Sequence, residues 1–163
     1  MRDVLKGNTE RGNLMETDSL PSEIRLEDSL GYLISSVKVR MSACLDKELA
    51  ELEITHAQWV ILMRIAGGLG QTCADLCRVA SYDTGSMTRM LDRLEEKRLI
   101  QRVRSQEDRR VVEVRLTSLG KELLPRLRKS GEAVLARMVD GFTPEEVALG
   151  KGLLRRMMEN LVE

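Results

Sequence analysis

Two short stretches in the middle of the chain are rich in side chains that form hydrogen bonds with nucleic acids. The first stretch presents hydroxyl and guanidinium groups along one predicted helix, at Thr84, Ser86, Thr88, Arg89 and Arg93. The second stretch consists of Asp108, Arg109 and Arg110. Arginine and small hydroxyl side chains contact the base edges and phosphates of duplex DNA. We therefore expect these residues to bind DNA.

The other reactive side chains do not form a catalytic or metal-binding set. His56 is the only histidine, and no cluster of Asp, Glu or Cys with metal-ligand spacing surrounds it. The sequence shows no paired catalytic carboxylates, no nucleophile with a neighbouring base and no glycine loop that would cradle a phosphate. We predict that the chain is not an enzyme and holds no metal or cofactor.

The distribution of charge supports a basic surface although the net charge is zero. Between Arg78 and Arg115 there are ten Lys and Arg against seven Asp and Glu, an excess of three. Residues 1–24 and 140–163 each contain three basic and five acidic residues. A local basic face matters more for DNA binding than the sum over the chain.

Cysteine usage and the start of the chain bear on the compartment. Three cysteines are too few and too irregularly spaced for a secreted disulfide framework, so we expect reduced thiols. The first residues, MRDVLKGNTE, contain no apolar signal core, and no stretch approaches 18 apolar residues. We expect a cytoplasmic protein that does not enter the membrane.

Hydrophobic periodicity predicts a mainly α-helical fold with a small β-hairpin. Apolar residues recur at three- and four-residue spacing, and the predicted helices cover 22–52, 55–66, 72–80, 84–97, 117–140 and 144–161. Thr55 with Gln58 forms a capping box, and Thr143 followed by Pro144 is a strong helix start. The period changes to two at 100–105 and 111–116, which predicts two strands joined by the polar segment SQEDRR. Residues 1–22 show no periodicity and are expected to form a flexible arm.

Two adjacent short helices followed by a hairpin with a basic tip are typical of a winged helix-turn-helix. In that arrangement the helix from Thr84 enters the major groove, and the hairpin tip enters the neighbouring minor groove, where arginine is favoured. We expect Asp108 to orient an arginine through a charge-assisted hydrogen bond. For Arg102 and Arg104 two roles stay open, since they either contact phosphate or only flank the strand.

Residues 88–123, TRMLDRLEEKRLIQRVRSQEDRRVVEVRLTSLGKEL, resemble the multiple antibiotic resistance regulators, the MarR family. The resemblance rests on the order and spacing of several pieces, and extends over about residues 26–163. These pieces are Thr88-Arg89, Leu94-Glu95, Leu99-Ile100, Asp108-x-Arg110, Val114-x-Leu116-Thr117 and Gly120. Arg98 departs from the pattern, because the family commonly has glycine at this helix end, where a left-handed turn is expected.

The resemblance implies a homodimeric repressor that binds a palindromic operator and is released by a small phenolic or aromatic carboxylate ligand. It implies dimerisation regions at 23–54 and 117–163, with a winged helix-turn-helix at 55–116 between them. Arg110 would occupy the minor groove. The ligand pocket would lie between the dimerisation and DNA-binding regions, with these candidate residues: Tyr32, Ser36, Arg40, His56, Trp59 and Met63.

Several alternatives remain open at the sequence level. His56 also fits a helix end at the surface, Trp59 fits the core, and Arg40 fits an ion pair at a dimer face. Cys44 raises the alternative of a redox-sensing repressor, although a buried structural cysteine is the more common case. A winged helix used only for protein contact is a further alternative, and it predicts no salt-dependent binding to duplex DNA.

Overall fold

The computed structural model describes residues 26–80 and 82–161, so the predicted arm at 1–22 lies outside the described residues. The chain divides into two compact units, Met1–Val37 and Lys38–Glu163. Within the described residues, no helix is both long enough and apolar enough to cross a membrane.

Six α-helices and one hairpin are present in the described ranges. In chain order they are α1 (Leu30–Leu49), α2 (His56–Ala66), α3 (Cys73–Ala80), α4 (Thr84–Glu96), β1 (Ile100–Arg104), β2 (Val112–Leu116), α5 (Ser118–Met138) and α6 (Pro144–Asn160). The fold is thus mainly helical with a two-stranded antiparallel wing, as the sequence predicted.

The first helix is more broken than the sequence pattern indicated. Short 3-10 turns, Leu26–Asp28 and Ala50–Leu52, flank α1, whereas periodicity predicted one helix over 22–52. Ser29 separates the first turn from α1, because its hydroxyl donates to the Leu26 carbonyl and accepts from the Tyr32 amide. A serine bonded in this way caps a new helix instead of continuing the previous one.

Capping side chains set where most helices begin. Thr55 and Gln58 form the predicted capping box at α2. Thr117 accepts from the Gly120 amide at the start of α5. Thr143 forms a second capping box with Glu146 at α6. Each of these hydroxyl groups binds an amide of the first helical turn that has no partner within the helix.

The hairpin is joined to the helices by its second strand and by its base. Ile100 pairs with Leu116 and Arg104 with Val112. On the outer side of β2, the Val114 amide donates to the Gln71 carbonyl at 2.7 Å. The loop before α3 therefore makes a single antiparallel bridge to β2, between Thr72 and Glu113, which anchors the wing.

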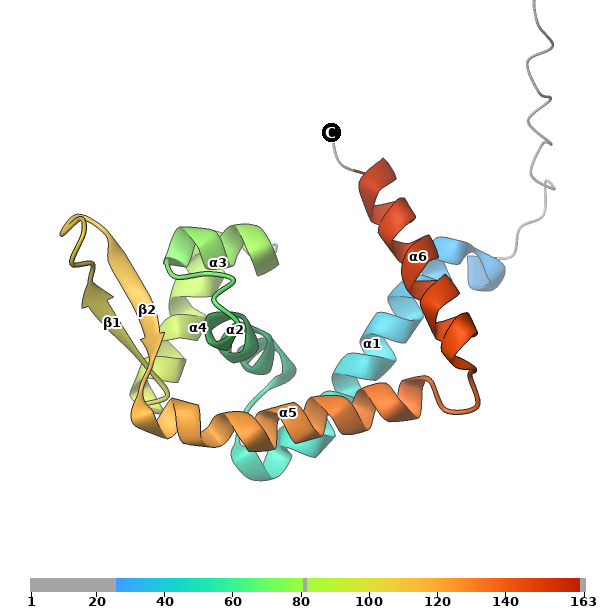
Figure 1. Cartoon of the computed structure of the whole chain (residues 1–163), viewed down its shortest axis with the longest axis horizontal. Helices are drawn as coiled ribbons and strands as arrows, with labels where there is room; N and C mark the ends of the chain where they lie inside the picture. The colour runs from blue at the N-terminus through green and yellow to red at the C-terminus, as the bar shows by residue number, and fades with distance from the viewer. Residues whose placement is uncertain (1–25, 81, 162–163) are drawn as a thin grey trace, which may run out of the picture. The chain divides into compact units, whose positions relative to one another are not determined.

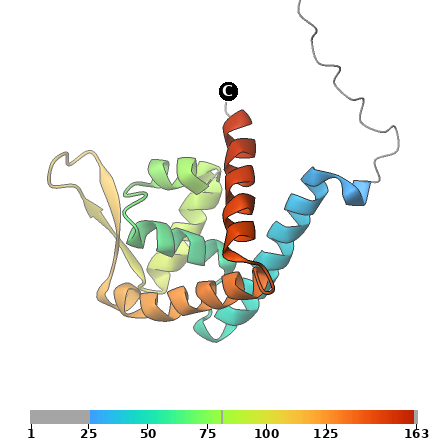
Figure 2. The same cartoon turned by 45° about the vertical axis from the view of Figure 1, so that its right-hand side comes forward.

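One core holds α2, α3, α4, the hairpin and α5 together. Its buried side chains come from all of these elements and from the last part of α1; those that are fully enclosed are Leu49, Ile61, Leu62, Leu76, Met87, Leu91, Leu94, Ile100 and Leu127. Figure 1 shows α2, α3 and α4 grouped together, with the hairpin beside them and α5 along their base. The hairpin still projects past α3 and α4 in the turned view of Figure 2.

Candidate nucleic-acid interface

Helix α4 presents a polar face outward because its apolar face is fully used in the core. Met87, Leu91 and Leu94 are buried, and α4 packs against α3 and β1. Asp83 caps the helix, its carboxylate accepting from the Ser86 amide at 2.8 Å. The hydrogen bonds from Ser86, first the hydroxyl and then the amide, lower the pKa of Asp83. The start of α4 is therefore held by an ionised aspartate.

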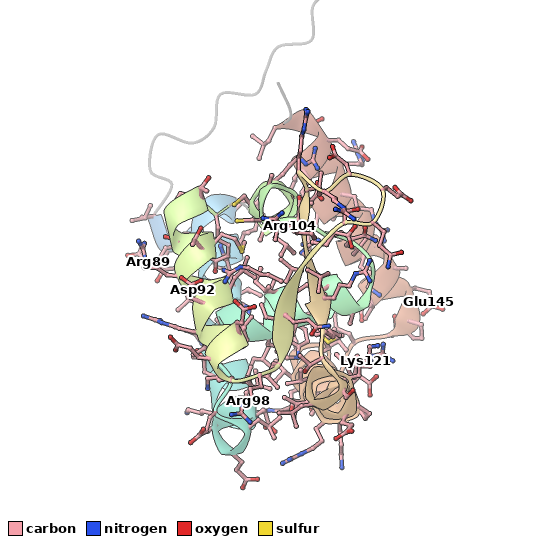
Figure 3. All side chains as sticks on the ribbon, turned by 90° about the vertical axis from the view of Figure 1, so that its left-hand side faces the viewer. Arg89, Asp92, Arg98, Arg104, Lys121 and Glu145 are labelled. Atoms are coloured by element: carbon pink, nitrogen blue, oxygen red, sulfur yellow. The ribbon has the colours of Figure 1, made fainter. Side chains whose placement is uncertain are left out.

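The predicted DNA-contacting residues of α4 lie on the outward face. Thr84, Thr88, Arg89 and Arg93 are exposed, and Ser86 is half-buried. Arg89 extends from α4 away from the neighbouring elements in Figure 3. Its guanidinium donates to the Ser86 hydroxyl at 3.2 Å, while the Thr88 hydroxyl donates to the Thr84 carbonyl at 2.8 Å.

A notch of about 250 Å³ separates this face of α4 from the start of α2. Arg89 and Arg93 line one side of the notch, and Thr55 and Ala57 line the other. Two guanidinium groups beside the amide end of a helix form a positively charged recess on the same face of the protein.

The hairpin tip is exposed, and Asp108 shapes it. Asp108, Arg109 and Arg110 are all exposed. Asp108 accepts from the backbone amide of Arg110 at 2.9 Å, and its carbonyl accepts from the Val111 amide, also at 2.9 Å. The expected bond from Asp108 to an arginine side chain is therefore replaced in this structure by a bond to the main chain. The aspartate closes the turn and leaves both guanidinium groups free to point outward.

Arg102 binds two acidic side chains, an environment that neither of its two predicted roles included. Its guanidinium binds the carboxylates of Asp92 and Glu95 on α4, at 2.7 and 2.6 Å. Burial by itself would lower the pKa of Arg102, but the hydrogen bonds to Asp92 and Glu95 outweigh it, so the pKa is raised. The guanidinium of Arg102 is therefore bound within the protein and is not available to a phosphate.

A tight junction joins α4 to the hairpin and α5. Arg98 has a φ of 57°, so the left-handed turn expected at this position forms with arginine instead of glycine. The Thr117 hydroxyl donates to the Arg98 carbonyl at 2.6 Å, and the Thr117 amide donates to the Leu99 carbonyl at 3.1 Å. Gly120 packs so closely that a Cβ there would lie 2.1 Å from the Leu99 carbonyl oxygen.

Comparison with known proteins places this arrangement in a family. The family model described as the MarR family matches residues 54–112. The multiple antibiotic resistance protein MarR of Escherichia coli is 33% identical over 130 residues, which cover 79% of this chain and 90% of that protein. The chain belongs to the MarR family.

Solved structures show the same fold. A crystal structure of a mutant MarR from Escherichia coli with operator DNA has a TM-score of 0.72 and 33% identity, and the match covers 78% of this chain and 92% of that one. A structure of Bordetella bronchiseptica BpsR, described with regulation of its DNA binding by 6-hydroxynicotinic acid, has a TM-score of 0.74 at 23% identity and covers 83% of this chain and 97% of that one. The first likeness, together with family membership, shows that this chain is a DNA-binding transcriptional regulator and not an enzyme. The second concerns the fold alone.

The candidate ligand residues of this MarR-family chain lie in both units. Tyr32, exposed, and Ser36, half-buried, are on the first turns of α1. In the second unit, Arg40 is exposed near the middle of α1, whereas His56, Trp59 and Met63 lie half-buried on one side of α2. No ion pair of Arg40 is found within the described residues.

Trp59 has a structural role between two helices. Its indole Nε1 donates to the Leu127 carbonyl of α5 at 2.8 Å. The ring lies against Gly131, where a Cβ would come within 2.5 Å of it. Trp59 therefore holds α2 against α5, and its polar group is already satisfied. The His56 backbone amide donates to the Asp46 carboxylate of α1 at 2.6 Å, which ties the start of α2 to α1.

The cysteines offer little support for thiol chemistry. Cys44, Cys73 and Cys77 are free and half-buried. Burial, and then the neighbouring Cys73, raises the pKa of Cys77, which disfavours the reactive thiolate. Within the described residues, no group of three or more His, Cys, Asp and Glu side chains is placed to hold a metal ion.

Proposed function

We propose that this MarR-family regulator is a homodimeric repressor whose α4 helices and wings bind the two halves of a palindromic operator, and that a small aromatic carboxylate or phenol releases it. The observation that carries the DNA-binding mode is the outward face of α4, with Arg89 and Arg93 exposed, beside a wing whose tip carries Arg109 and Arg110. A two-fold dimer presents two such modules, and a palindromic site mirrors that symmetry.

The apolar surface of α6 supports the dimer. Within the part of the chain that the structure describes, none of the side chains of this 17-residue helix is fully buried. Exposed apolar patches of this kind mark interaction sites. The dimerisation regions we propose are 23–54 and 117–163, because the family resemblance implies that the outer helices intertwine with those of the partner subunit.

The ligand class is supported by residue chemistry. Arg40 offers a guanidinium that binds a carboxylate in a bidentate manner. His56, Trp59 and Met63 offer polar and apolar surface on the second unit of the same chain. Tyr32 and Ser36, on the first turns of α1, are further candidates that the family resemblance implies.

The deciding experiment is a fluorescence-anisotropy titration of the purified protein on the DNA upstream of its own gene, at two salt concentrations, with unrelated duplex in excess. We expect tight, sequence-selective binding that weakens steeply with salt, because Lys and Arg displace counterions from the phosphates. Absence of salt-dependent binding to this DNA and to genomic fragments would contradict a DNA-binding function and favour protein contact.

The effector is tested in the same assay. A panel of hydroxylated benzoates, cinnamates and nicotinates is added to the complex, including 6-hydroxynicotinic acid. Release by one acid, lost in Arg40→Ala and retained in Arg128→Ala, supports the proposed site. Release that instead needs an oxidant and depends on Cys44 would support the redox-sensing alternative.

A further inference from the structure

An ion-pair cluster joins the two elements that face DNA. Asp92 and Glu95 lie on α4, and Arg102 lies on β1 at the base of the wing. Three hydrogen bonds connect them: the Arg102 amide donates to Glu95 Oε1 at 3.0 Å, Nη1 donates to Glu95 Oε2 at 2.6 Å, and Nη2 donates to Asp92 Oδ1 at 2.7 Å.

The geometry of the cluster restrains the wing in more than one direction. Asp92 and Glu95 are three residues apart, so they lie on neighbouring turns of one face of α4. The planar guanidinium bridges both carboxylates, while the hydrogen bond from the Arg102 backbone amide to Glu95 fixes the main chain of the strand to the same helix. Sliding the strand along α4, or rotating it, would break at least one of these bonds.

Arg102 is also shielded, since its side chain is only 28% exposed. Its neighbour Arg104, two residues along the same strand, is exposed and has no ion pair within the described residues. Figure 3 labels Asp92 on α4 and Arg104 on the hairpin. The two arginines are therefore a natural pair for comparison, because one is bound within the protein and the other is free.

We propose that Arg102 is a positioning residue for sequence-selective DNA binding, which fixes the spacing between α4 and the wing without contacting DNA itself. The proposal rests on the proposed use of α4 and the wing on DNA. Selective binding requires the helix and the tip to enter adjacent grooves together, whereas non-specific binding depends on phosphate contacts that tolerate variation in spacing. Loosening the cluster should thus reduce selectivity more than affinity for unrelated DNA.

The experiment uses a duplex that the wild-type protein enriches from a random-sequence pool, and a scrambled duplex of the same length. Binding of full-length protein to both is measured over a range of salt concentrations. For Arg102→Met we expect about tenfold weaker binding to the enriched duplex, with little change on the scrambled duplex and an unchanged salt slope. Arg104→Met is the matched control, and if it contacts phosphate it weakens both duplexes and lowers the slope by about one.

The two acidic partners of Arg102 give a second test, because substituting them removes negative charge instead of positive charge. Asp92→Asn and Glu95→Gln each remove a negative charge near DNA, so affinity for the scrambled duplex should rise. A positioning role nevertheless requires the ratio of enriched to scrambled affinity to fall in both variants, as in Arg102→Met. A purely electrostatic role would raise both affinities equally and leave the ratio unchanged.

Folding is monitored by circular dichroism, and Arg102→Lys serves if Arg102→Met does not fold. Lysine keeps the charge but not the fork that bridges both carboxylates, so the ratio should fall while the salt slope stays constant. An unchanged ratio in Arg102→Lys and Asp92→Asn, or a slope lowered by about one in Arg102→Lys, would overturn the positioning role. Failure of the wild-type protein to enrich any duplex would instead contradict the DNA-binding function on which the proposal rests.

Discussion

At the scale of single residues, Arg89 and Arg110 should contribute differently to DNA binding. Arg89 lies on the outward face of α4, and Arg110 lies at the wing tip. We expect each alanine substitution to weaken operator binding by about 1–3 kcal/mol, and Arg89→Ala also to relax the preference for sequence if its guanidinium contacts a base. Anisotropy titrations with matched and mutated duplexes measure both effects, with Arg128→Ala on α5 as the control. Normal operator affinity in Arg110→Ala would refute the role of the wing.

Arg98 occupies a backbone conformation that costs free energy. Its φ of 57° is in the left-handed region, where a Cβ meets the following carbonyl group. Arg98→Gly should raise the free energy of unfolding by about 0.5–1 kcal/mol, because the relieved strain exceeds the added flexibility of the unfolded chain. Urea denaturation measures the change. Arg98→Ala retains the Cβ and should show no such gain, so an equal gain in both variants would speak against strain.

Gly120 is the one position where the junction of the wing and α5 admits no side chain at all. A Cβ would lie 2.1 Å from the Leu99 carbonyl oxygen, which already accepts from the Thr117 amide. Because the obstructing atom belongs to the main chain, Gly120→Ala should lower the free energy of unfolding by about 3 kcal/mol. Thermal denaturation compares it with Lys121→Ala, which changes an exposed residue of the same turn. Equal melting temperatures for the two variants would contradict this account.

At the scale of elements, the start of α4 depends on the charge of Asp83. Its pKa is lowered by the hydrogen bonds from Ser86, so the folded state holds the carboxylate more strongly than the unfolded state does. Its contribution is therefore fully present above the unfolded-state pKa of about 3.9 and is lost as the pH falls through the lower, folded-state value.

Asp83→Ala removes this cap and should lower the melting temperature at neutral pH. The difference from wild type should stay constant above about pH 5 and shrink below about pH 4, as the native aspartate becomes protonated. Melting curves over this range, followed by circular dichroism, test the sign. A difference that grows as the pH falls would contradict the role assigned to the carboxylate.

Local patterns predicted the elements, while contacts between elements were beyond their reach. Capping residues such as Thr55 and Thr143 act within one turn, so the sequence alone located these helix starts. The break at Ser29 was missed because the apolar spacing continues across it and a serine side chain also fits within a helix. The partners of Arg102 lie seven and ten residues earlier, across a turn whose geometry no periodicity describes. In the sequence, the acidic pair Asp92 and Glu95 on α4 is the signal that a basic residue binds there.

At the scale of the whole molecule, the exposed apolar face of α6 supports the proposed dimer. Leu149, Leu153 and Leu154 are 64%, 43% and 48% exposed. A helix of this length is marginal in water unless it buries one face, and we expect a partner to cover the apolar face of α6. A second copy of the chain is the partner we propose, since the resemblance to the family implies that the outer helices pair in a homodimer.

If the folded unit is a dimer, its stability must depend on protein concentration. Each tenfold increase should add about 1.4 kcal/mol to the free energy of unfolding of the dimer and raise the melting temperature by a few degrees. Leu153→Glu places a charge in the apolar face and should shift the mass measured by light scattering toward the monomer. Arg155→Glu introduces the same side chain on the opposite face of α6 and should leave the dimer intact. A melting temperature independent of concentration, with the mass of a monomer for the wild-type protein, would show that α6 is stable by itself and would remove the basis for a palindromic operator.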